Sequence, residues 1–199
     1  MAAIASETDR LLELARAHLP GGGIWTFATR PPGFGKTLDL PDFLIERADG
    51  AYVWTTDGER LLDLVLGSGT VLTGHGHPEV VAAVTAQISR VVNVSHLTPP
   101  AVELAARICQ VVPCAERVRL FNSGTEAWAV ALRVLRARVG RDRVLKFEGA
   151  FHGGNDATLF NTSFGDVPTW AAAPVPTPDT PGTARSDAAN VITAPYDDI

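Results

Sequence analysis

Residues 120–127 constrain the fold of this chain more than any other stretch, because they read as a strand that runs directly into a helix. Apolar residues precede Asn122, and from Gly124 onward apolar residues recur at helical spacing. Ser123 and Glu126 stand three residues apart, which is the spacing of a capping box at a helix N-terminus. We therefore expect a strand over 118–121 and a helix over 124–139, with Gly140 ending the helix.

The predicted helix start has the chemistry of an anion site. Free backbone N–H groups and the positive end of the helix dipole meet there and suit a phosphate. Gly124 would let the anion approach the backbone, and Ser123 and Thr125 would add hydroxyl donors. A capped helix without a ligand is the plain alternative for so short a motif.

A second strand expected over 144–147 completes a strand–helix–strand unit, which predicts a parallel sheet. Ligands bind beyond the carboxyl ends of such strands, so residues 122–125 and 149–156 should share one rim. On that rim Phe151, His152, Gly153 and Gly154 would let a flat ring lie against the backbone. The two segments together favour a planar, phosphorylated cofactor.

Composition excludes several classes of protein. The chain has 199 residues with 17 basic and 22 acidic side chains, a net charge of −5, so no basic face indicates nucleic acid or an anionic membrane. Its two cysteines read as ordinary thiols of a reducing compartment. Residues 1–19 carry three acidic side chains and predict neither a signal peptide nor a membrane span, so a cytoplasmic location is expected. His75 and His77 lack a third ligand at suitable spacing, and no metal is predicted.

The remaining pattern predicts an α/β protein with two parts, residues 1–70 and 71–199. The first part should hold a helix over 6–18 and three strands, over 43–48, 51–54 and 60–64, joined by Asp-Gly turns. Two further helices are expected over 78–90 and 100–111, and a short strand at 191–192. The loop over 21–41 is equally consistent with a segment that packs on the core and with one that lines the substrate side of the site.

Four blocks in this order resemble the class III aminotransferases: residues 74–78, 121–127, 140–142 and 146–153. Within that family the chain is similar to glutamate-1-semialdehyde 2,1-aminomutase and its relatives. The resemblance implies a pyridoxal-phosphate (PLP) enzyme of fold type I. Its amino-terminal helix and small antiparallel sheet would precede the start of a large domain, in which a mainly parallel sheet lies between helices.

The resemblance also implies roles for individual residues. Ser123, Gly124 and Thr125 would hold the cofactor phosphate, Phe151 would lie on one face of its ring, and His152 would be nearby. Ser68 would line the substrate side, and Arg30 is a candidate partner for a substrate carboxylate. The family acts on a small-molecule amino donor and a keto or aldehyde acceptor, and it works as a homodimer.

The chain has only two lysines, Lys36 and Lys146, and neither matches the family position that carries the cofactor as a Schiff base. It therefore resembles the amino-terminal half of an aminotransferase, and we expect that it cannot transaminate alone. A catalytically inactive fragment or pseudo-enzyme is the alternative. A Rossmann-type NAD-dependent oxidoreductase is weaker, because no Gly-x-Gly-x-x-Gly follows a strand.

Overall fold

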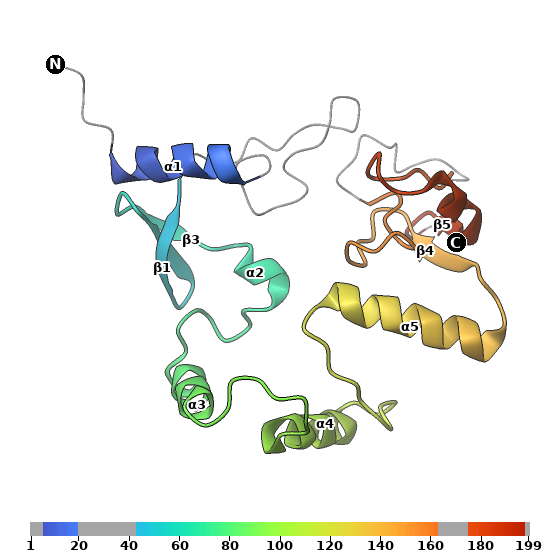
Figure 1. The fold of residues 1–199 in the computed structure, drawn as a ribbon, viewed down its shortest axis with the longest axis horizontal. Coiled ribbons are helices and arrows are strands. Elements are labelled where there is room, and N and C mark those ends of the chain that lie inside the picture. Colours follow the sequence, from blue (N-terminus) through green and yellow to red (C-terminus); the bar gives the residue numbers. More distant parts are fainter. Residues whose placement is uncertain (1–5, 20–42, 163–174, 198–199) are drawn as a thin grey trace. The chain divides into compact units, whose positions relative to one another are not determined.

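The structure is a computed structural model that describes residues 6–19, 43–162 and 175–197. These residues fall into two compact units, one made of residues 6–19 and 43–97 and the other of residues 98–162 and 175–197 (Figure 1). The domain boundary that the sequence predicts near residue 70 stays a prediction. No helix within the described residues is long and apolar enough to cross a membrane.

The first unit begins with helix α1 (Glu7–His18). The predicted N-cap, Ser6, accepts a hydrogen bond from the Asp9 amide, and the Asp9 carboxylate accepts one from the Ser6 amide. The buried Thr8 hydroxyl contacts Thr56 and donates to Asp57 Oδ1, each across 2.7 Å. The capping box thus begins the helix, and Thr8 joins it to the sheet that follows.

That sheet contains β1 (Ile45–Asp49), β2 (Tyr52–Thr55) and β3 (Arg60–Leu62), antiparallel and in the order β1-β2-β3. The three predicted strands and their Asp-Gly turns are confirmed. The Arg47 guanidinium lies 3.6 Å from the centre of the Trp54 ring, and the Arg60 guanidinium lies 4.7 Å from that of Tyr52. Both cation–π contacts link neighbouring strands: Arg47 lies directly opposite Trp54, whereas Arg60 lies opposite Trp54 and reaches Tyr52 diagonally.

A left-handed turn, α2 (Leu66–Gly69), comes next, with φ of 51° at Leu66, 58° at Gly67, 60° at Ser68 and 88° at Gly69. Two of these residues carry a Cβ, so the turn is a strained piece of backbone. Helix α3 (Pro78–Ile88) then follows with Pro78 in its first turn, as predicted.

The second unit holds the helices α4 (Pro99–Val111) and α5 (Gly124–Val139), the strand β4 (Val144–Phe147), the 3₁₀ helix η2 (Arg185–Asn190) and the strand β5 (Val191–Ala194). β4 and β5 pair in parallel, with Val144 opposite Val191 and Phe147 opposite Ala194. The predicted helices and the strands at 144–147 and 191–192 are confirmed, and so is a parallel arrangement.

The strand predicted over 118–121 is wrong for this structure, in which these residues lie outside any helix or strand. The predicted strand–helix–strand unit therefore does not form. A strand needs a hydrogen-bonding neighbour, and no segment of the described chain pairs with residues 118–121. Leu120 is accordingly exposed. The parallel pair is made instead by β4 and β5, and η2 directly precedes β5 in the chain.

Residues 158–162 form a continuous buried segment of the second unit, and Phe160 is completely buried. The Gly149 amide donates to Asn161 O at 2.7 Å, and the Asn161 amide donates to Thr177 O at 3.0 Å. Residues 158–162 are thus bonded to the end of β4 on one side and to residues 175–179 on the other. This small core lies directly beside the segment predicted to form the rim.

Candidate functional site

The start of α5 has the predicted capping box. The Glu126 amide donates to Ser123 Oγ at 3.2 Å, and Glu126 Oε2 accepts the amides of Asn122 at 2.9 Å and Ser123 at 3.2 Å. At the other end Gly140 has φ of 65° and its amide bonds to Arg136 O. Both ends of α5 are therefore set by residues within four positions along the chain.

Two amides at the start of α5 have no acceptor within the described parts of the chain, those of Gly124 and Thr125. A Cβ added at Gly124 would meet nothing within 4 Å, so the backbone there is open to a ligand. The positive end of the helix dipole lies at the same place. The donors and the space together fit an oxyanion such as a phosphate group.

The structure brings this helix start together with the second rim segment. The Gly154 amide donates to Thr125 Oγ1 at 3.1 Å. Gly153 has φ of +84°, and a Cβ there would lie 2.5 Å from Thr125 Oγ1 and 2.7 Å from Thr125 Cα. The two segments predicted to share a rim are thus in direct contact, and the contact requires glycine at position 153.

The aromatic residues of the rim differ in their surroundings. Phe151 is 44% exposed, whereas the His152 imidazole is partly buried against the Trp128 indole, with the ring centroids 4.6 Å apart and the planes at 61°. Burial, helped by the positive charge of Lys146, holds the pKa of His152 below its ordinary value. Sequence reasoning missed Trp128. The feature that could have indicated it is an aromatic side chain in the second turn of the helix whose start forms the candidate anion site.

Lys146 is buried, and its ammonium donates to the carbonyl of Phe160. Burial lowers the pKa of Lys146, and the carboxylates of Asp179 and Glu148 oppose that shift. Both carboxylate oxygens of Glu148 are buried and have no hydrogen-bond partner in the described part of the chain. The Lys146 amine is thus hydrogen-bonded to the Phe160 carbonyl within the buried segment next to the rim.

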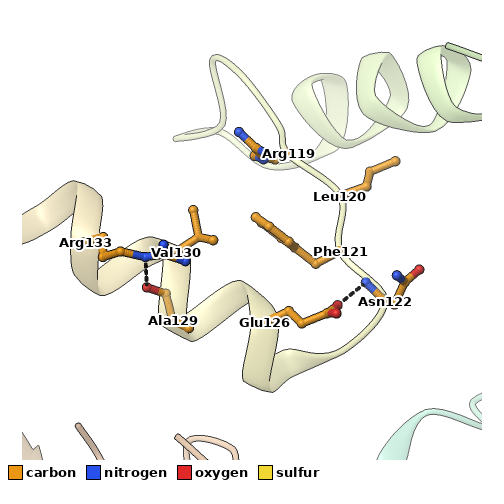
Figure 2. A pocket seen from close by; sticks show the side chains of 8 residues that line it. All are labelled: Arg119, Leu120, Phe121, Asn122, Glu126, Ala129, Val130 and Arg133. Atoms are coloured by element: carbon orange, nitrogen blue, oxygen red, sulfur yellow. Dashed lines mark hydrogen bonds between the residues drawn. The ribbon is translucent and has the colours of Figure 1, made fainter. Parts of the chain in front are cut away.

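Two cavities border α5. One of 490 Å³ is lined by Asn122 and Glu126 together with Arg119, Leu120, Phe121, Ala129, Val130 and Arg133 (Figure 2). It lies where residues 118–121 were expected to form a strand, and none of the five residues predicted to bind the cofactor lines it. The other, of 280 Å³, has Trp128, Lys146, His152 and Thr158 among its lining residues and extends along α5 and β4. The smaller cavity therefore adjoins the rim.

The two predicted substrate residues are placed differently. Arg30 lies outside the described residues, and Ser68 lies in the left-handed turn of the first unit. Near that turn, His75 Nε2 pairs with Asp63 Oδ2 at 2.7 Å, a partner that sequence reasoning missed. Within residues 6–19, 43–162 and 175–197, no group of three or more His, Cys, Asp or Glu side chains could hold a metal ion.

Comparison with known proteins bears directly on this arrangement. The sequence pattern of the family Aminotransferase class-III matches residues 36–174. The glutamate-1-semialdehyde 2,1-aminomutase of Methanopyrus kandleri is 36% identical over 193 residues, which cover 97% of this chain and 42% of that protein.

Solved structures agree in fold. An omega-transaminase from Sphaerobacter thermophilus matches with a TM-score of 0.84 and 34% identity, covering 99% of this chain and 43% of that one. A transaminase with PLP bound matches with a TM-score of 0.81 and 28% identity over the same shares.

The chain spans less than half the length of the relatives it matches. The family pattern nevertheless covers most of its residues, and the mixed fold agrees with PLP transferases of fold type I. The chain belongs to the class III aminotransferase family.

Proposed function

We propose that this chain supplies the phosphate side of a PLP-dependent site for amino-group transfer, as in a class III aminotransferase or an aminomutase of the glutamate-1-semialdehyde type. Ser123, Gly124 and Thr125 would hold the phosphate, and Phe151 and His152 would line the ring. The observation that carries the proposal is the open start of α5, where the Gly124 and Thr125 amides lie beside Gly153 and Gly154. A solved relative contains PLP.

The residues present fit such a cofactor on three counts. The amides of Gly124 and Thr125 and the Thr125 hydroxyl are donors, as a phosphate requires. The space above Gly124 admits a close approach. Burial lowers the pKa of His152, which favours the neutral imidazole, and that form can accept or donate a hydrogen bond without adding charge.

When bound, PLP would supply an electron sink that stabilises a carbanion on the substrate. This chain's residues would bind and orient the cofactor, and the lysine that carries it is expected outside these 199 residues. We therefore propose that the chain alone binds PLP without transferring amino groups. The same proposal includes Arg30 and Ser68 as substrate contacts, with an amino donor and a keto or aldehyde acceptor as substrates. It also includes a homodimer and a cytoplasmic location.

Titration of the chain with PLP tests the proposal. We expect saturable binding, measured by equilibrium dialysis, that inorganic phosphate competes away. Ser123→Ala should weaken it by about tenfold, because the loss of one hydrogen bond to a charged group costs about 1.4 kcal/mol. No binding, or binding indifferent to phosphate, would refute the phosphate site. A stoichiometric cofactor absorption band that disappears in Lys146→Met would show that the chain carries its own cofactor lysine, contrary to our expectation.

A further inference from the structure

Thr125 occupies an unusual position between the two segments of the rim. It is the second residue of α5, and its hydroxyl oxygen accepts the Gly154 amide across 3.1 Å from 29 residues further along the chain. The backbone of Gly153 is so close that a Cβ there would lie 2.7 Å from Thr125 Cα. One side chain therefore contacts both the start of the helix and the glycine pair of the rim.

The hydrogen atoms at this helix start can be accounted for individually. The amides of Asn122 and Ser123 go to the Glu126 carboxylate, and the Glu126 amide goes to Ser123 Oγ. Within the described residues, the amides of Gly124 and Thr125 have no acceptor. These two N–H groups are the backbone donors that remain for an anion.

The Thr125 hydroxyl adds a third donor. A hydroxyl has one hydrogen and two acceptor positions, and the Gly154 amide uses an acceptor position. The Thr125 hydrogen goes to no acceptor among residues 6–19, 43–162 and 175–197. It is therefore available to an anion, and donating it leaves the bond from Gly154 in place.

We propose that Thr125 is a positioning residue that couples occupancy of the helix start by a phosphate group to the order of residues 152–154. Donation of its hydrogen to the anion polarises the hydroxyl and strengthens its acceptance of the Gly154 amide, because hydrogen bonds in a chain reinforce one another. Phosphate binding thereby fixes the rim segment against which the ring would lie. This inference rests on the proposed function. It adds that binding of the PLP phosphate orders the rim segment that would contact the PLP ring.

Hydrogen exchange of the Gly154 amide, followed by NMR with inorganic phosphate and separately with PLP, tests the coupling. We expect either ligand to slow Gly154 exchange by about 1.5- to 2-fold in the wild-type chain, because the bond already exists and is strengthened by about 10–30% of its worth. Thr125→Ser keeps the hydroxyl and should keep this response. Thr125→Val keeps the shape without the hydroxyl, and it should lose the response and bind PLP about tenfold more weakly.

Thr85→Val in α3 is the matched control, since Thr85 is exposed in the other unit, and its Gly154 response should equal that of the wild type. Binding of PLP with no change at Gly154, or an unchanged response in Thr125→Val, would overturn the coupling and leave the proposed function standing. If neither PLP nor phosphate binds the wild-type chain, both are refuted. Exchange of the Leu159 and Asn161 amides shows whether Thr125→Val is folded. We expect both amides to exchange at the wild-type rate, and faster exchange would indicate that the variant has lost its fold.

Discussion

The indole of Trp128 lies edge-on against the imidazole of His152, with 4.6 Å between the ring centroids. The contact joins the second turn of α5 to the rim segment and excludes water from one side of the imidazole. Burial is the main reason why the pKa of His152 is lowered, and the charge of Lys146 adds to it. Trp128 is thus one of the side chains that cover the imidazole of a residue that sequence alone identified only as a neighbour of the cofactor.

Replacing Trp128 should change the titration of His152. We expect Trp128→Leu to raise the pKa of His152 toward its ordinary value, because water regains access to the ring. The folded chain binds the His152 proton less tightly than the unfolded chain, so stability is present above the unfolded pKa and is lost as the pH falls through the folded one. NMR titration of His152 measures the shift. Trp54→Leu, in the other unit, is the control, and equal titration curves for both variants would contradict the assignment.

Gly153 should be intolerant of a methyl group, and Gly154 should tolerate one. Gly153→Ala places a Cβ 2.5 Å from Thr125 Oγ1 on backbone with φ of +84°, which we expect to cost about 1–3 kcal/mol. Gly154→Ala meets no atom within 4 Å and keeps its amide, so its effect should stay within about 0.5 kcal/mol. Exchange of the Leu159 and Asn161 amides in urea reports the stability of this unit. Similar losses in the two variants would argue against the contact with Thr125.

Gly124→Ala separates ligand binding from folding. The added Cβ has open space and alanine favours helix over glycine, so stability should be unchanged or slightly higher. PLP affinity should nevertheless fall by about tenfold if the anion needs close approach to this backbone. Isothermal titration calorimetry measures the affinity, and Gly182→Ala, also in open space, serves as the control. Wild-type affinity in Gly124→Ala would place the phosphate elsewhere.

Asp63 and His75 should govern the acid sensitivity of the first unit. The hydrogen bond from His75, followed by those from the Leu66 and Val65 amides, lowers the pKa of Asp63. The stability that this provides is present above the unfolded pKa of Asp63 and is lost as the pH falls through its folded pKa. Asp63→Asn should speed exchange of the Gly50 and His75 amides a few-fold, and Asp63→Ala should speed it more, because asparagine can still accept the two backbone amides.

Exchange measured by NMR in steps from neutral pH down through the folded pKa of Asp63 checks this prediction. The difference between wild type and Asp63→Asn should shrink as the pH falls through that pKa, because the wild-type carboxylate then loses its charge. Glu103→Gln, an exposed change in α4, should leave both amides unaffected. An undiminished difference at low pH would show that the charge of Asp63 is not what holds His75.

The sequence by itself determined the elements whose signals lie within a few residues. The capping boxes of Ser6 with Asp9 and of Ser123 with Glu126 are local, and so are the Asp-Gly hairpins and the left-handed Gly140. The order of four short blocks was enough to identify the family, which the family pattern over residues 36–174 confirms. The predicted roles of the site residues stay predictions.

Only the tertiary structure decided which distant residues meet. The contacts of Thr125 with Gly153 and Gly154, of Trp128 with His152 and of Asp63 with His75 join positions 12 to 29 residues apart, and nothing in the local sequence encodes them. Residues 118–121 show the converse: their apolar pattern suits a strand, yet a strand forms only where a second segment supplies hydrogen bonds. Helix caps are satisfied within one turn of chain, whereas strands and side-chain pairs depend on what the rest of the fold brings beside them.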